Sequence, residues 1–252
     1  MDGGSGTSPG AERPRVSVVI PTLNEARNIE HVLSTLPDDV FEVVVVDGGS
    51  TDGTVDVARA ARPDVRIVRQ PGRGKGDALV AGLGACTGDA VVMIDADGST
   101  DGREIPRFVD ALVEGAAFVK GSRFLEGGGS ADISPLRRAG NRGFCVLVNR
   151  IYGTRYSDLC YGFNAGWRGS LSQLSLDCDG FEVETIFSIR SAKSGLRVTE
   201  VPSFELRRLH GQSNLKPMRD GWRVLKAILR ERSVVITTST AEAGGTQAVN
   251  EI

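Results

Sequence analysis

The chain of 252 residues lacks any long apolar run, and its formal net charge is only −2 at pH 7. No window approaches the roughly 18 consecutive apolar residues that a membrane-spanning helix needs. The amino-terminal MDGGSGTSPGAERPR contains no apolar stretch of the kind that signal peptides carry, so we expect a cytoplasmic protein. The balanced charge gives no reason to expect a nucleic acid as partner.

Cysteine is also scarce, with four residues at Cys86, Cys145, Cys160 and Cys178. None of them has C-x-x-C spacing, and the chain contains only two histidines. This pattern argues against a zinc knuckle and against a disulfide framework. We expect four free thiols in a reducing compartment.

The remaining composition, 40% hydrophobic and 25% charged, is that of an ordinary globular protein. Residues 1–14 are rich in Gly, Ser and Pro, and residues 233–252 are small and polar. Neither segment offers enough apolar surface to fold, so both are predicted to be disordered tails. Residues 15–232 are expected to form a single domain.

Apolar runs typical of buried strands alternate with helical patterns through the first half of this domain. The runs are Val16–Ile20, Phe41–Val46, Val65–Val68 and Ala90–Ile94. Such alternation predicts an α/β protein with a mostly parallel, twisted sheet flanked by helices. Ligands bind such sheets at the carboxyl ends of the strands, so the turns that follow these runs are the first places to look for a site.

The sequence Ala90–Gly98, AVVMIDADG, places two carboxylates at such a strand end. Asp95 and Asp97 repel each other unless something positive lies beside them. Mg²⁺ or Mn²⁺ holding a diphosphate would meet that need, because these cations prefer oxygen ligands. A solvated turn is the alternative reading of an isolated D-x-D.

Three further turns carry chemistry or capping signals. Thr22–Glu25 has the S/T-x-x-E form of a helix capping box, and it is also placed to contact a nucleotide base. Asp47 ends a strand before two glycines, where it either accepts hydrogen bonds from a base or ribose or simply forms a turn. Lys75 lies in the Gly-rich basic loop Gly72–Gly76, which would approach a phosphate.

The second half of the chain offers candidates for acid–base and phosphate chemistry. Asp158 lies in Ser157–Arg168, a stretch that we expect to be irregular, and Glu182 lies near the start of a predicted helix, 181–194. Glu184 is two residues further on and should face another direction, so Glu182 is the preferred general base and Asp158 its rival. Arg208 lies in a basic loop that could clamp a phosphate.

The last predicted helix, Pro217–Arg232, is amphipathic. Met218, Trp222, Leu225 and Leu229 form an apolar stripe that is surrounded by lysines and arginines. Such a stripe either packs on the protein core or lies on an anionic membrane.

Taken together, VSVVIPTLNEARNIE, VVVVDGGSTDGT, GRGKGDAL and VVMIDADG resemble the family 2 glycosyltransferases, which have the GT-A fold of nucleotide-diphospho-sugar transferases. VKGSRF, DLCYGFNAGWR and VPSFELRRLHGQSN are similar to the dolichyl- or polyprenyl-phosphate hexose synthase branch of that family. The resemblance implies a nucleotide-binding half over about 15–122 and an acceptor half over about 123–232.

The resemblance also implies roles for individual residues. Around the donor it places Pro21, Thr22, Glu25, Asp47, Lys75, Asp95, Ala96, Asp97 and Arg208. Asp95 and Asp97 would hold the metal, with Asp97 the better candidate for direct contact, and Arg208 would close over the phosphates. Two departures stand out, because many relatives have an acid at Gly48 and a lysine at Asn214.

These observations predict a metal-dependent inverting glycosyltransferase that uses Mg²⁺ or Mn²⁺ and a UDP- or GDP-linked sugar. The first acceptor hypothesis is polyprenyl phosphate at the inner membrane face, with the last helix as a peripheral contact. A soluble hydroxyl acceptor is the second hypothesis, and it would require Asp158 or Glu182 as general base. A non-catalytic sugar-nucleotide scaffold is the third. The oligomeric state stays open.

Overall fold

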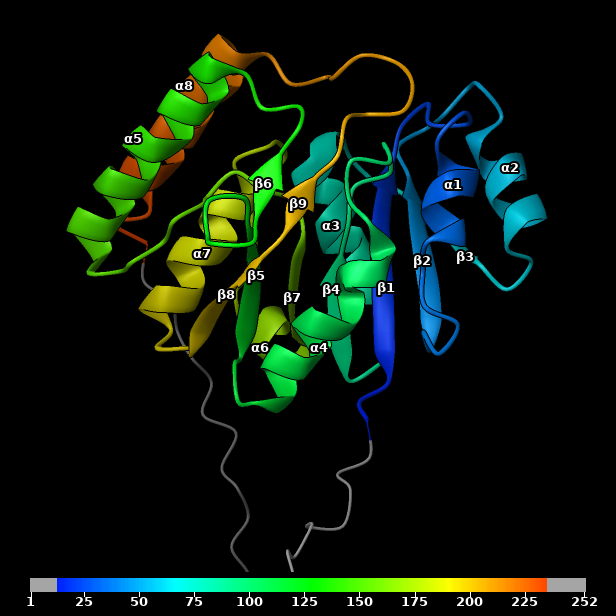
Figure 1. Cartoon of the computed structure of the whole chain (residues 1–252), viewed down its shortest axis with the longest axis horizontal. Coiled ribbons are helices and arrows are strands. Elements are labelled where there is room, and N and C mark those ends of the chain that lie inside the picture. Colours follow the sequence, from blue (N-terminus) through cyan, green and yellow to red (C-terminus); the bar gives the residue numbers. More distant parts are fainter. Residues whose placement is uncertain (1–12, 235–252) are drawn as a thin grey trace, which may run out of the picture.

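The computed structural model describes residues 13–234, which form a central sheet with helices on both faces (Figure 1). The expectation of disordered tails falls almost wholly outside these residues. The strands are β1 (Val16–Thr22), β2 (Glu42–Asp47), β3 (Arg66–Arg69), β4 (Ala90–Met93), β5 (Phe118–Ser122), β6 (Gly129–Ser130), β7 (Asn164–Trp167), β8 (Val198–Pro202) and β9 (Phe204–Glu205). The helices are α1 (Ile29–Ser34), α2 (Thr54–Ala61), α3 (Gly74–Ala85), η1 (Gly102–Glu104), α4 (Ile105–Val113), α5 (Pro135–Tyr152), α6 (Arg168–Ser172), α7 (Val183–Lys193) and α8 (Pro217–Arg230).

Seven strands form the main sheet in the order β3-β2-β1-β4-β7-β5-β8. All neighbours are parallel except β7, which runs antiparallel to β4 and to β5. This confirms the predicted α/β class with its mostly parallel sheet. The carboxyl ends of β1, β2, β3 and β4 therefore lie along one edge.

Alternate residues of β1 serve two apolar layers. Val18 and Ile20 pack with α1 and α4 on one face, and Val19 packs with α3 and α7 on the other. A third cluster joins α5, α7 and α8 at one end of the molecule. In Figure 1 the helices α5 and α8 lie side by side at the upper left, away from β1 and β2.

Two local predictions are wrong. Helix α1 begins at Ile29 after Asn28, and the hydroxyl of Thr22 donates to the carbonyl of Val46, so Thr22–Glu25 is not a capping box. The stretch 157–168 is not wholly irregular, because it contains β7. That strand reads NAGW, and its small residues give no alternating pattern that could have identified it.

Candidate active site

A cavity of about 570 Å³ opens where β1 and β4 end and α3 begins. Eight of the nine residues that the sequence placed around a donor line it: Pro21, Thr22, Glu25, Lys75, Asp95, Ala96, Asp97 and Arg208. The fold brings these residues together from four separate segments of the chain. Their contact with a donor stays a prediction.

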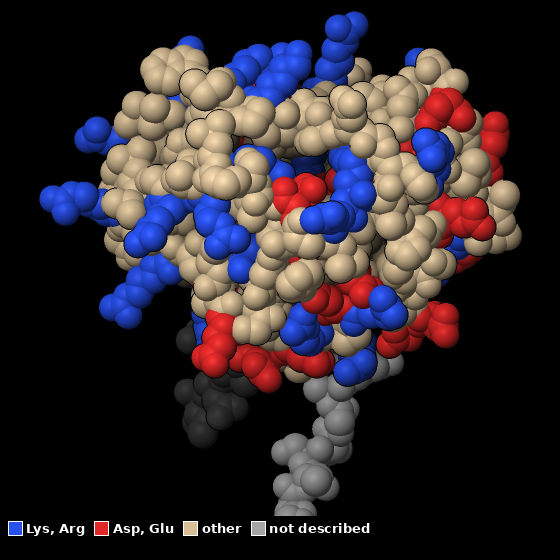
Figure 2. Space-filling model, turned by 45° about the horizontal axis from the view of Figure 1, so that its top comes forward, with Lys and Arg blue, Asp and Glu red and all other residues tan. Residues whose placement is uncertain are grey.

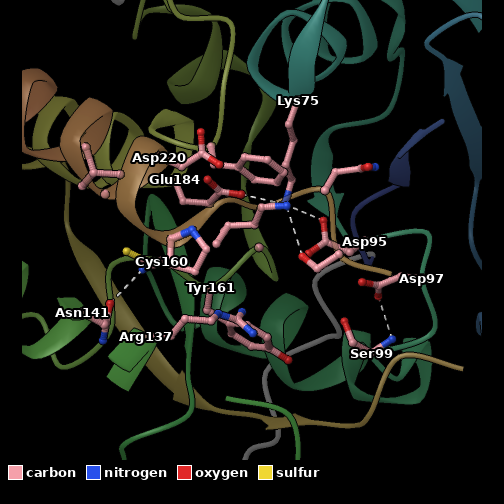
Figure 3. Close-up of a pocket in the computed structure, with 18 of the residues that line it drawn as sticks. Lys75, Asp95, Asp97, Ser99, Arg137, Asn141, Cys160, Tyr161, Glu184 and Asp220 are labelled. Atoms are coloured by element: carbon pink, nitrogen blue, oxygen red, sulfur yellow. Dashed lines mark hydrogen bonds and ion pairs between the residues drawn. The ribbon is translucent and has the colours of Figure 1, made fainter. Parts of the chain in front are cut away.

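Lys75 holds the first acid of the D-x-D pair. Its Nζ lies 2.5 Å from Asp95 Oδ1 and 2.6 Å from Glu184 Oε1, and all three side chains meet in the cavity (Figure 3). Burial alone would lower the pKa of Lys75, but the two carboxylates raise it above its ordinary value. A fixed positive charge therefore lies at the end of β4.

Arg208 holds the second acid. Its guanidinium contacts Asp97 Oδ2 at 2.7 Å and Glu25 Oε1 at 2.9 Å. The other oxygen of Asp97 accepts a hydrogen bond from the backbone N–H of Ser99 at 2.9 Å. Burial alone would lower the pKa of Arg208, but Asp97 and Glu25 raise it. The prediction that something positive lies with the two acids is met by two side chains of the chain itself.

The loop that carries Arg208 is tied to the D-x-D turn. The backbone N–H of Leu209 donates to the carbonyl of Asp97 at 3.2 Å, and that of Leu206 donates to the carbonyl of Ser99 at 2.8 Å. The side chain of Leu209 packs on Gly98, which has φ +76° and no room for a Cβ. Arg208 is therefore positioned by backbone contacts as well as by its ion pairs.

In the Gly-rich basic segment 72–76, the missing side chain of Gly76 allows close packing against the backbone of residues 178 and 179. A Cβ on Gly76 would lie 2.1 Å from the carbonyl oxygen of Cys178, and the N–H of Gly76 donates to the carbonyl of Asp179. The start of α3 can approach the segment before α7 this closely only without a side chain. This contact brings Lys75 next to Glu184.

The residues at the end of β4 fit a divalent cation that a ligand helps to hold. Among residues 13–234 there is no group of three or more His, Cys, Asp and Glu side chains that could bind a metal alone. Mg²⁺ in proteins commonly takes one or two carboxylates and completes its shell with substrate phosphates and water. Asp95 and Asp97 would supply those carboxylates, and a diphosphate would supply further oxygens.

Asp47 does not line the cavity. Its carboxylate accepts hydrogen bonds from the backbone N–H groups of Gly49 and Ser50 at 3.1–3.2 Å. Its oxygens hold the turn after β2, and its contact with a base or ribose stays a prediction.

Neither predicted general base reaches the cavity. Asp158 is fully buried and forms a two-pronged ion pair with Arg123, at 2.7 and 3.0 Å. Glu182 precedes α7 and pairs with Arg223 of α8 at 2.8 Å. Glu184 lines the cavity instead, so the choice between the two glutamates was wrong. No sequence signal distinguishes them, because packing of α7 against α3 and α8 sets the direction of each.

The cavity continues as an apolar groove between α5 and α8. Its apolar lining there includes Leu136, Phe144, Trp222 and Leu225. Arg137 of α5 lies on this lining with a quarter of its side chain exposed, and its ion pairs are long, 3.4 Å to Asp132 and 3.7 Å to Glu205. Arg137 is not among the site residues predicted from the sequence, although it belongs to an arginine pair at the start of a helix without acids.

Comparison with known proteins identifies the family of this chain. A family model described as glycosyl transferase family 2 matches residues 17–175. Glycosyltransferase AglJ of Haloferax volcanii is 37% identical over 218 residues, which cover 82% of this chain and 68% of that protein. The undecaprenyl-phosphate mannosyltransferase of Micrococcus luteus is 34% identical over 215 residues, 80% of this chain and 87% of that protein.

Among solved structures, glucosyl-3-phosphoglycerate synthase from Mycobacterium tuberculosis, in complex with Mn²⁺, UDP and glucosyl-3-phosphoglycerate, superposes with a TM-score of 0.70. It is 26% identical, and the match covers 93% of this chain and 88% of that chain. The fold and the site define a GT-A glycosyltransferase. The chain belongs to glycosyltransferase family 2. The alternative of a non-catalytic scaffold is set aside, because members of the assigned family are enzymes.

Proposed function

We propose that this enzyme transfers a hexose, with inversion, from a nucleoside-diphosphate sugar to polyprenyl phosphate at a membrane surface, with Mg²⁺ or Mn²⁺ at Asp95 and Asp97. Relatives whose names specify dolichol phosphate or undecaprenyl phosphate support the acceptor. The structural neighbour that binds UDP with Mn²⁺ supports the donor and the metal. The observation that carries the proposal is the cavity itself, which joins the D-x-D turn to an apolar groove.

The carboxylates of the cavity favour a phosphate acceptor over a hydroxyl. A hydroxyl nucleophile needs a free base within about 3 Å, whereas an acceptor phosphate is already an anion. Seven acids line the cavity, and each has an ion-pair partner: Glu25, Asp95, Asp97, Asp132, Glu184, Glu205 and Asp220. Within the described residues, the cavity therefore holds no unpaired carboxylate for that task.

In this reaction an acceptor phosphate oxygen forms a bond to the anomeric carbon, and the bond from that carbon to the diphosphate breaks. The electron pair leaves with the nucleoside diphosphate. A bound cation would stabilise this charge as a Lewis acid. Lys75 and Arg208 lie where they can share it, and Arg137, whose own ion pairs are long, would hold the acceptor phosphate.

The surface of α5 and α8 beside this groove suits an anionic membrane, and Met218 and Trp222 belong both to this surface and to the cavity lining. Apolar side chains are exposed there, with Met218 79%, Trp222 57% and Val146 62% accessible. The exposed basic residues of this region are Arg138, Arg142, Arg150, Lys216, Arg219, Lys226 and Arg230. Neither helix has an exposed acid, since α5 contains none and Asp220 of α8 is buried. In Figure 2 blue side chains project from this end of the molecule, as charge attraction to anionic lipid requires.

The structure has no helix among residues 13–234 that could cross a membrane. Contact of α8 with lipid would use its apolar side chains and basic charge, which is the mode that amphipathic helices use. The groove between α5 and α8 would receive the polyprenyl chain from that surface.

A transfer assay tests the proposal. Purified enzyme with Mn²⁺ would receive radiolabelled UDP-glucose, UDP-N-acetylglucosamine or GDP-mannose, with polyprenyl phosphate in detergent or with 3-phosphoglycerate in buffer. We expect label in the organic phase with one of these donors, and no transfer without the divalent cation. Label that enters only a water-soluble product would contradict the lipid acceptor and favour a soluble one.

A further inference from the structure

The ends of β1, β2 and β3 form a slot beside the diphosphate site. Thr22 is the last residue of β1 and Leu23 follows it, Gly48 follows β2, and Gln70 follows β3. The backbone N–H of Gly48 donates to the carbonyl of Thr22, and that of Gln70 donates to the carbonyl of Asp47, both at 2.9 Å. Three adjacent strand ends are therefore locked together, and the cavity is lined here by Thr22, Leu23 and Gln70.

The side-chain amide of Gln70 has one fixed orientation. Its Nε2 donates to the carbonyl of Gly74 at 2.7 Å, so a flipped amide would place oxygen against oxygen. Its Oε1 faces the gap at Gly48, where it lies 2.9 Å from the position that a Cβ on that residue would occupy. Among the described residues, no donor is recorded for this oxygen.

The absence of a side chain at position 48 makes this arrangement possible. A Cβ there would also lie 3.3 Å from the carbonyl oxygen of Thr22 and 3.5 Å from Leu23 Cδ1. Gln70, Thr22 and Leu23 therefore already surround the space that a side chain at position 48 would need. Gln70 thus presents a hydrogen-bond acceptor at the position where the resemblance leads one to expect an acid at residue 48. Leu23, which is 46% exposed, offers an apolar surface beside it.

We infer that Gln70 selects the base of the donor nucleotide by accepting a hydrogen bond from a ring N–H. This inference rests on the proposed function and narrows its donor class. Uracil carries N3–H and guanine carries N1–H on the Watson–Crick edge, whereas cytosine N3 and adenine N1 are acceptors. If the base keeps the same position, cytosine N3 or adenine N1 would oppose its lone pair to that of Oε1, which is costly in a partly buried slot. Their exocyclic amino groups would reach Oε1 only if the base shifted.

Calorimetry on the full-length enzyme with Mn²⁺ and each of UDP, GDP, CDP and ADP tests this selection. We expect UDP or GDP to bind roughly 10- to 100-fold more tightly than CDP and ADP. Gln70→Leu should reduce that ratio towards one, and Gly48→Ala should weaken the preferred nucleotide because its Cβ displaces Oε1. Gln173→Leu, at an exposed glutamine after α6, is the matched control and should leave the ratio unchanged.

The ratio of UDP or GDP affinity to CDP or ADP affinity distinguishes base selection by Gln70 from a purely structural role. If Gln70 served only to tether the loop at Gly74, its loss would weaken all four nucleotides equally and leave the ratio intact, which would overturn the inference. Equal binding of all four nucleotides to the wild-type enzyme would overturn it as well. Failure of every nucleotide to bind the folded wild-type enzyme would contradict the donor site itself, and with it the proposed function.

Discussion

The guanidinium of Arg208 lies 2.7 Å from Asp97 Oδ2, on the carboxylate that the sequence assigns to the metal. A divalent cation at that oxygen would compete with the guanidinium for its negative charge. We expect cation and donor binding to release Arg208 from Asp97, so that the arginine can reach the diphosphate. Its second partner, Glu25 at 2.9 Å, keeps it near the site.

Arg208→Ala should therefore lower kcat by about 10²–10³-fold, the usual loss when one donor to developing negative charge is removed. Steady-state kinetics with saturating Mn²⁺ measures this effect. Arg207→Ala is the control, because Arg207 is exposed and its side chain donates to the carbonyl of Ala131 at 3.3 Å instead of facing the cavity. Equal activity of the Arg208 variant and wild type would remove Arg208 from the mechanism.

Asp97→Asn should abolish the Mn²⁺-dependent part of UDP or GDP affinity while the fold survives. The amide keeps the shape and can still accept from Ser99 N–H, but it loses the charge that a hard cation needs. Calorimetry with and without Mn²⁺ measures the difference, and circular dichroism checks the fold. Metal-dependent affinity that persists in the variant would contradict the assignment of Asp97 to the metal.

The parts of this structure that could be predicted from sequence are those in which neighbours along the chain decide the outcome. The run Ala90–Ile94 is apolar and ends in two acids, so a buried strand with carboxylates at its end followed directly. The same local logic predicted a helix after the Gly-rich segment 72–76, although α3 begins inside that segment, at Gly74. The strand β7 could not be predicted in this way. Its four residues are held in place by antiparallel pairing with β4 on one side and β5 on the other, which are distant in sequence.

The parts that could not be predicted depend on contacts between distant segments. Arg123 and Asp158 are 35 residues apart, and nothing near either one shows that they are buried together. Glu184 faces Lys75 across 109 positions of the chain (184 minus 75), because α3 packs on the segment before α7. Such pairs become visible only when the fold is known.

Asp158→Asn should destabilise the protein without removing catalysis, since Asp158 itself does not line the cavity and instead holds Arg123, which does. Loss of this charge removes one partner of the buried Arg123 guanidinium, and we expect the free energy of unfolding to fall by about 3–5 kcal/mol. Burial alone would raise the pKa of Asp158, but Arg123 holds it below its ordinary value of 3.8. The stabilisation is therefore present at neutral pH, and it is lost only as the pH falls below 3.8 through the folded-state pKa.

Urea unfolding at pH 7 measures the loss in the Asp158 variant, and turnover at low temperature shows what survives. We expect a reduced free energy of unfolding with kcat close to that of wild type. A folded variant of unchanged stability but without activity would restore Asp158 as a catalytic base.

Replacement of Trp222 and Met218 by serine should weaken binding to anionic vesicles. Both side chains are more than half exposed on α8, and burial of one large apolar side chain in the interface favours binding by roughly tenfold or more. Flotation with vesicles of phosphatidylglycerol and phosphatidylcholine measures the bound fraction. Val113→Ser is the matched control, because Val113 is 54% exposed on α4, which lies apart from α5 and α8 (Figure 1). Equal flotation of all variants, or none by wild type, would contradict a membrane-binding surface on α8.

Arg137→Ala should raise the KM for polyprenyl phosphate by roughly 10- to 100-fold, the cost of losing a hydrogen bond to a charged group. The KM for the donor should stay near its wild-type value, because Arg137 lies on the α5 side of the cavity and Lys75 and Arg208 lie at the strand ends. Arg138→Ala is the control, since this neighbour is exposed and is not part of the cavity lining. If both variants raise the acceptor KM equally, Arg137 contributes only to the general charge of the surface. If the donor KM rises instead, the acceptor phosphate lies elsewhere, and the groove between α5 and α8 loses its assigned role.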